Sequence, residues 1–188
     1  MTDKPAWQVT ANRTLLKDRW IHLRAETYVT PAGATITPYY VNDWPDWVMV
    51  VAITADDQLV LVRLWRPPVR QYVLEPVAGM IDPGETDPAR VAQRELLEET
   101  GYTADSFAAL PFAPFSDPAR NTNRVHVVVA PNARRIAEPR REAAEADMQT
   151  VLLPVPEVLA GIPAGRFGHG LQYGGLLLGL QAAGRISF

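Results

Sequence analysis

The chain has 188 residues, of which 47% are apolar and 21% are charged, a composition typical of a globular protein with one core and at most a small appendage. The net charge of −3 and the absence of cysteine argue against a nucleic-acid partner, disulfides and thiol catalysis. No apolar run reaches the roughly 18 residues of a membrane span, and the N-terminus lacks a signal-peptide core, so we expect a cytoplasmic protein without a membrane partner.

Strand patterns dominate the chain on both sides of an acidic helix. Residues 22–26 and 35–41 alternate in polarity around Thr30-Pro31-Ala32-Gly33, whose proline and glycine favour a turn, so this stretch is predicted to be a hairpin. Apolar and β-branched runs predict further strands. They lie at residues 48–54, 59–65, 72–75, 125–130 and 148–153.

The helix predicted at residues 88–100 has the clearest boundaries. Asp87 is a good N-cap, Pro88 suits the first helical position, and Gly101 stands where a terminating glycine is common. Further helices are predicted late in the chain, at residues 155–160 and 170–183. Many strands with helices inserted late indicate an α+β fold, or an α/β sandwich around a mixed sheet.

Three carboxylates share one face of the acidic helix. Glu95, Glu98 and Glu99 lie at positions i, i+3 and i+4, which at about 100° per residue places them within an arc of about 100°. Like charges at this spacing destabilise an isolated helix, and Arg94 offsets only part of that effect. Because Mg²⁺ and Mn²⁺ prefer clustered carboxylates, the spacing suggests a metal site, with a solvated acidic face as the alternative.

The loop before the helix strengthens the prediction of a metal site. Gly79, Gly84 and Glu85 lie between the strand at residues 72–75 and the helix, and glycines permit close approach of the backbone. The backbone carbonyl of Ala78 offers a further hard oxygen ligand. A strand, a glycine loop and a carboxylate-bearing helix can together hold a metal ion against a substrate diphosphate.

Residues 79–102, GMIDPGETDPARVAQRELLEETGY, resemble the Nudix box. The nine defined positions of that motif, with one residue inserted between the first glutamate and the arginine, are filled by Gly79, Glu85, Arg94, Glu95, Leu96, Glu98, Glu99, Gly101 and Tyr102. The resemblance implies that Glu95 and Glu99 are metal ligands and that Glu98 contributes directly or through water. It also implies that the carbonyl of Ala78 completes the inner shell around Mg²⁺, with Mn²⁺ as the alternative ion.

The same resemblance implies a fold and a division of the chain. The expected fold is a Nudix-type α/β/α sandwich around a mixed β-sheet, formed by residues 46–188. A small N-terminal β segment, residues 1–45, is expected to precede it. Within the box, Gly79, Glu85 and Arg94 are expected to support the loop and the helix, with the glutamate and the arginine paired.

Segments outside the box resemble the ADP-ribose pyrophosphatase subgroup of Nudix hydrolases. Residues 61–66 are similar to the strand before the box in that subgroup, and residues 74–79 are similar to its entry into the box. Pro118 lies sixteen residues after Tyr102, close to where the subgroup carries a proline. The N-terminal segment of that subgroup often exchanges across a homodimer, so a homodimer is expected here.

The subgroup resemblance implies Mg²⁺-dependent cleavage of the diphosphate of a nucleoside diphosphate sugar, foremost ADP-ribose to AMP and ribose 5-phosphate. Arg66, Glu75 and Arg124 are expected to contact this substrate. Arg66 is the best candidate for the diphosphate itself, since a guanidinium group matches phosphate oxygens. An ordinary surface salt bridge is the alternative for Arg66. Glu145 is expected to be the general base beside the box glutamates, with Glu142 as the alternative.

Two rival functions stay open. One is hydrolysis of another nucleotide, such as GDP-mannose, a UDP-sugar, a dinucleoside polyphosphate or an oxidised nucleotide. The other is a Nudix-fold module that binds ADP-ribose without cleaving it, which the presence of every box glutamate disfavours.

His126 is predicted to be a satisfied core or sheet histidine. A basic cluster is interleaved with glutamates and is predicted to be a solvated face; it comprises Arg134, Arg135, Arg140 and Arg141.

Overall fold

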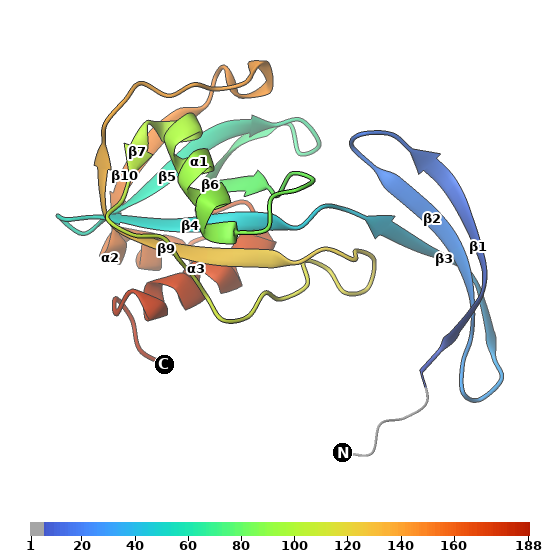
Figure 1. Ribbon diagram of the computed structural model, residues 1–188. Helices are drawn as coiled ribbons and strands as arrows, with labels where there is room; N and C mark the ends of the chain where they lie inside the picture. The colour runs from blue at the N-terminus through green and yellow to red at the C-terminus, as the bar shows by residue number, and fades with distance from the viewer. Residues whose placement is uncertain (1–5) are drawn as a thin grey trace. The chain divides into compact units, whose positions relative to one another are not determined.

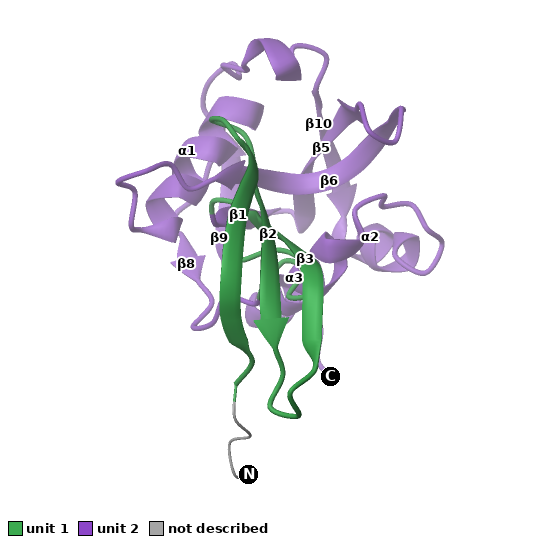
Figure 2. Ribbon diagram, turned by 90° about the vertical axis from the view of Figure 1, so that its right-hand side faces the viewer, with its two compact units in different colours: residues 1–45, 115–124 green, residues 46–114, 125–188 purple. Residues whose placement is uncertain are grey.

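The computed structural model describes residues 6–188, which form two compact units (Figure 2). The first unit contains the described residues up to Pro45 together with residues 115–124. The second unit contains Asp46–Pro114 and Val125–Phe188. Nothing in the sequence of residues 115–124 indicates that this segment joins the N-terminal part of the chain.

The first unit is built on an antiparallel sheet. Its described strands follow the order β1-β2-β3, with β1 at Gln8–Lys17, β2 at His22–Val29 and β3 at Thr35–Asp43. The predicted hairpin is confirmed as β2 and β3, and Gly33 in its turn has a φ of +82°. The segment at residues 115–124 extends this unit, because Asn42 donates its backbone N–H to the carbonyl of Arg120 over 2.8 Å.

The second unit contains a mixed sheet. Its seven described strands follow the order β10-β5-β6-β4-β9-β7, and β8 pairs with β9. The strands are β4 at Trp47–Thr54, β5 at Gln58–Arg66, β6 at Gln71–Met80, β7 at Tyr102–Thr103, β8 at Ala108–Ala109, β9 at Val125–Arg135 and β10 at Gln149–Pro154. The pair β4–β9 is parallel and the others are antiparallel, so the predicted mixed sheet is confirmed.

Helices cover both faces of this sheet (Figure 1). The helices are α1 at Pro88–Thr100, α2 at Val155–Gly161 and α3 at Gly170–Ala182. Successive residues of a strand point to opposite faces, so Val48 and Val50 of β4 pack with Leu96 of α1, whereas Met49 packs with Leu176 of α3. The predicted α/β/α sandwich is confirmed, with one apolar core on each side of the sheet.

The glycines of α3 allow this helix to approach the sheet closely. A Cβ on Gly179 would overlap the side chain of Val51, and a Cβ on Gly175 would overlap that of Met49. Residues of low helix propensity therefore stand where the packing requires them. None of the helices among residues 6–188 is long and apolar enough to cross a membrane.

Candidate active site

The register of α1 is fixed by its caps and by its buried face. The side chain of Asp87 accepts the backbone N–H of Ala89 over 3.0 Å, and Gly101 ends the helix with a φ of +75°. Both predicted caps are therefore confirmed. Because Val91 and Leu96 are fully buried, rotation of the helix is restricted and the direction of the carboxylates is set.

The three carboxylates of α1 differ in exposure and in neighbours. The side chain of Glu98 is 47% exposed, that of Glu95 is 14% exposed, and Glu99 is 4% exposed as a residue. The carboxyl of Glu95 lies directly against the backbone of Gly79, where any Cβ would overlap it. Gly79 lies in β6 and not in the loop, and the absence of a Cβ there leaves room for the carboxyl of Glu95.

Arg94 forms hydrogen bonds to three carboxylates, those of Glu85, Glu95 and Glu98. Its guanidinium donates to both oxygens of Glu85 over 3.3 and 3.1 Å, and its Nη1 donates to Glu95 over 2.7 Å and to Glu98 over 3.2 Å. Glu85 also accepts the backbone N–H of Asp82 over 3.0 Å, and the bond from Arg94 lowers the pKa of Glu85. The inserted residue is thus accommodated in the loop without separating Glu85 from Arg94.

Glu99 lines a small cavity. The cavity has a volume of about 50 Å³ and brings together five residues predicted from the sequence, Ala78, Arg66, Glu75, Glu99 and Glu145. Apolar side chains close the rest of its wall; they belong to Val62, Leu64, Pro76 and Met148. The cavity therefore brings three carboxylates, one guanidinium and residues of two neighbouring strands together.

Burial raises the pKa values of two carboxyls in this region. Burial raises the pKa of Glu99 well above its usual value, and the nearby charges of Glu145 and Glu95 raise it further. Burial also raises the pKa of Glu95 to about 7, against the lowering effect of Arg94. Both carboxylates would be stabilised in their ionised form by a cation.

The donor set fits a hard divalent cation. The buried Oε2 of Glu99 has no hydrogen-bond partner among the described residues, so it is an acceptor that a bound cation would satisfy. Carboxylate and carbonyl oxygens are the donors that Mg²⁺ prefers. Within residues 6–188, however, no three acidic or histidine side chains converge on one ion-sized point, since Arg94 holds Glu95 and Glu98 while Glu99 faces the cavity.

Arg66 and Glu75, two of the expected substrate contacts, bind each other. Arg66 donates from Nε over 3.0 Å and from Nη2 over 2.6 Å to the two carboxylate oxygens of Glu75, which is 1% exposed. The side chain of Arg66 is itself 44% exposed, so part of it reaches solvent although its partner Glu75 is buried. Glu75 also accepts the side-chain amide of Gln172 over 3.3 Å. No sequence signal identifies Gln172, which lies in a glycine-rich helix.

The remaining expected residues have separate settings. Arg124 belongs to the first unit, where its guanidinium stacks 4.0 Å from the ring centroid of Phe115. His126 lies in β9 with its Nε2 3.3 Å from a carboxylate oxygen of Asp46, as expected for a satisfied sheet histidine. The prediction of a solvated basic cluster is wrong for Arg141, whose half-buried guanidinium donates to the carbonyl of Glu99 over 2.8 Å.

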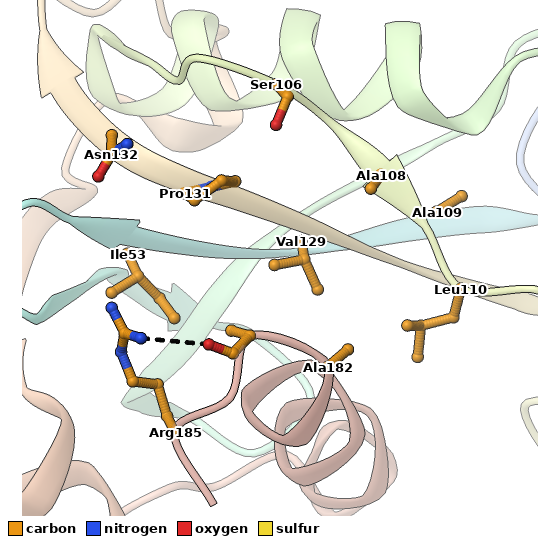
Figure 3. Close-up of a pocket in the computed structure, with 11 residues that line it drawn as sticks. Ile53, Ser106, Ala108, Ala109, Leu110, Val129, Pro131, Asn132, Ala182 and Arg185 are labelled. Atoms are coloured by element: carbon orange, nitrogen blue, oxygen red, sulfur yellow. Dashed lines mark hydrogen bonds between the residues drawn. The ribbon is translucent and has the colours of Figure 1, made fainter.

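A larger pocket in the second unit has different chemistry. It has a volume of about 380 Å³ and lies among β4, β8, β9 and the end of α3 (Figure 3). Its walls are mainly apolar, with Ile53, Leu110 and Val129 among them. The one charged side chain in its lining is Arg185, which is already bonded to Asp57 and to the carbonyl of Ala183. Without a carboxylate in its walls, this pocket cannot offer a metal site like that of the smaller cavity.

Known proteins resemble this chain in sequence and in fold. The NUDIX domain family matches residues 44–169, and the nucleoside diphosphate sugar hydrolase N-terminal domain family matches residues 7–42. ADP-sugar pyrophosphatase of Mus musculus is 31% identical over 170 residues, 83% of this chain and 77% of that protein. ADP-ribose pyrophosphatase of Bacillus subtilis is 30% identical over 142 residues, 76% of this chain and 75% of that protein. A crystal structure of an ADP compounds hydrolase shares the fold, with a TM-score of 0.83, 23% identity and coverage of 99% of this chain and 100% of that one.

Proposed function

This chain belongs to the Nudix family of hydrolases, and from that premise we propose that it cleaves the diphosphate of a nucleoside diphosphate sugar in a Mg²⁺-dependent reaction. The proposed substrate is ADP-ribose and the products are AMP and ribose 5-phosphate. The observation that carries the proposal is the buried, unbonded oxygen of Glu99 in a cavity shared with Glu145, Arg66 and the backbone of Ala78.

Two similarities support the choice of substrate. The named relatives act on ADP-sugars or ADP-ribose, and the matched N-terminal family is that of nucleoside diphosphate sugar hydrolases. Arg66 suits a diphosphate, because bonds to Glu75 hold its Nε and Nη2 while its Nη1 bonds to no described residue. The diphosphate would therefore contact a guanidinium group that Glu75 already holds in place.

The metal would be held by the carboxylates of Glu95, Glu98 and Glu99 and by the carbonyl of Ala78. When bound, Mg²⁺ supplies charge neutralisation at the diphosphate and lowers the pKa of a bound water. Glu145 lines the same cavity as Glu99 and would accept the proton of the attacking water.

In the proposed reaction, water adds to one phosphorus and the bond from that phosphorus to the bridging oxygen breaks. The second phosphate then leaves on its sugar, so one water is consumed for each diphosphate cleaved.

We also propose that the protein is a cytoplasmic homodimer that pairs through the N-terminal segment, residues 1–45. All ten residues of β1 are exposed, including the apolar side chains of Val9 and Leu16. The support is that four exposed apolar side chains, Trp7, Val9, Leu15 and Leu16, gather in and next to this strand, and gathered apolar surface is typical of an interface. Light scattering after size exclusion should give the mass of two chains, and a Leu16→Asp variant should give the mass of one.

A product assay tests the proposed reaction. The purified protein is incubated with Mg²⁺ and, separately, ADP-ribose, GDP-mannose, a UDP-sugar or a dinucleoside polyphosphate, and the products are resolved by ion exchange. We expect AMP from ADP-ribose at the highest rate and no product in a chelator. Glu99→Gln should nearly abolish turnover, whereas the control Glu157→Gln, at an exposed position on α2, should not change it.

Each other outcome of this assay has a defined meaning. Faster cleavage of a different nucleotide would overturn the choice of ADP-ribose. Full activity of Glu99→Gln would overturn the assignment of the metal site. If no nucleotide is cleaved, binding of ADP-ribose in a calorimetric titration would indicate a binding module in place of an enzyme.

A further inference from the structure

The segment that carries Glu145, residues 141–148, is attached to the end of α1 by its first residue and by the residue before it. The backbone N–H of Arg140 donates to the carbonyl of Glu98 over 2.7 Å, and Nε of Arg141 donates to the carbonyl of Glu99 over 2.8 Å. Carbonyls in the last turn of a helix have no partner within that helix. The segment therefore docks onto the turn that holds two of the proposed metal ligands.

Arg141 also forms hydrogen bonds at the far end of this segment. Its Nη1 donates to the carbonyl of Met148, and its Nη2 donates to the hydroxyl of Thr150 over 3.0 Å. All three nitrogens of one planar group are thus bonded to α1, to the end of the segment and to β10. Lysine cannot reproduce such an array, because its ammonium is a point charge without the fixed fork of the guanidinium.

Hydrogen bonds within the segment connect Glu145 to both of the ends that Arg141 holds. The carboxylate of Glu145 accepts the backbone N–H of Glu142 over 3.3 Å, and its carbonyl accepts the backbone N–H of Met148 over 2.9 Å. Two further side chains of the segment contact the sheet: Asp147 accepts the hydroxyl of Tyr72 over 2.8 Å at an exposed position, and Met148 is buried in the core with Val62 of β5. Met148 fixes the end of the segment by apolar packing, whereas the half-buried guanidinium of Arg141 supplies hydrogen bonds that tie the start of the segment to its end and to α1.

We propose that Arg141 is a positioning residue that holds Glu145 in the cavity opposite Glu99. This inference rests on the proposed function, in which Glu145 accepts a proton during hydrolysis. Without Arg141 the segment between residues 141 and 148 loses the hydrogen bonds that join its start to its end and to α1, so Glu145 spends less time at the cavity. The turnover number falls, whereas the binding of substrate by Arg66 is retained.

Three variants test the role of Arg141 in turnover. Arg141→Met removes the hydrogen bonds, Arg141→Lys keeps the charge, and Arg140→Met is the matched control because the Arg140 side chain is exposed and its backbone bond survives. We expect kcat for ADP-ribose to fall about 10- to 100-fold in Arg141→Met with KM within about twofold, and Arg141→Lys to recover little of the loss. Arg140→Met should behave as the unmodified protein.

A double-mutant cycle separates positioning from general damage to the fold. If Arg141 acts through Glu145, then Arg141→Met should lower kcat no further once Glu145→Gln is present. An equal loss in both backgrounds would overturn the proposal. So would a rise in KM that accounts for the whole effect, or an unchanged kcat in Arg141→Met.

Hydrogen exchange gives a readout that does not depend on activity. Amides of residues 141–148 should exchange faster in Arg141→Met than in Arg140→Met, while those of α1 keep their rates. Unchanged exchange in this segment would overturn the inference even if the protein hydrolyses ADP-ribose. If the unmodified protein cleaves no nucleotide, the proposed function fails, and the exchange result still decides whether Arg141 anchors the segment.

Discussion

Replacing Glu95 with glutamine should flatten the pH dependence of the unfolding free energy of the metal-free protein. In the folded chain, burial raises the pKa of Glu95 to about 7, whereas the same carboxyl titrates at 4.5 when it is unperturbed. At about 1.4 kcal/mol for each tenfold change in the protonation equilibrium, this difference corresponds to at most about 3.5 kcal/mol. Glutamine has nearly the same shape and no charge, so it avoids this penalty.

The sign of the effect follows from where the proton resides. Between pH 4.5 and about 7 the folded state keeps a proton on Glu95 that the unfolded state has lost, so stability falls as pH rises through this window. The raised pKa of Glu99 acts in the same direction. Glu85 and Asp105 have lowered pKa values, so their contributions to stability are lost only when the pH falls below the usual range of a carboxyl.

The measurement is denaturant unfolding in a chelator at pH 5 and at pH 8. The unmodified protein should lose stability between these values, and Glu95→Gln should lose less by up to about 3 kcal/mol. Glu98→Gln is the matched control, because the Glu98 side chain is 47% exposed on the same helix. Mg²⁺ should stabilise the unmodified protein more at pH 8 than at pH 5. Equal pH dependence in Glu95→Gln and the unmodified protein would refute the reasoning.

Three further predictions concern the support of the site. Gly79→Ala should displace the carboxyl of Glu95 and weaken Mg²⁺ binding at least about tenfold, measured by calorimetry; unchanged affinity would remove Glu95 from the ligand set. Arg66→Met should leave the buried carboxylate of Glu75 without its ion pair and lower the unfolding free energy by about 1 to 3 kcal/mol, measured by denaturation at pH 7; a change below about 0.5 kcal/mol would contradict this. Asp87→Ala should remove the N-cap of α1 and cost about 1 kcal/mol in the same assay, with kcat unchanged; a large loss of turnover would show that the cap also orders the site.

The sequence alone determined the features that depend on short stretches of chain. The caps of α1 are read from Asp87 and Gly101, and the shared face of Glu95, Glu98 and Glu99 follows from helical geometry. Apolar runs located the buried strands, since a strand covered on both faces is apolar throughout. The box motif combined these local signals and correctly indicated the sandwich fold.

Only the tertiary structure decided which distant residues meet. The bond from Gln172 to Glu75 joins positions 97 residues apart, and the bond from Arg141 to Glu99 joins positions 42 residues apart. Such pairs depend on strand order and on the path of loops, which periodicity and spacing do not encode. A basic run therefore looks alike in sequence whether it is solvated or, as for Arg141, turned inward onto free helix carbonyls. Partners of this kind arise because a fold must satisfy its buried polar groups wherever the packing of the whole chain leaves them.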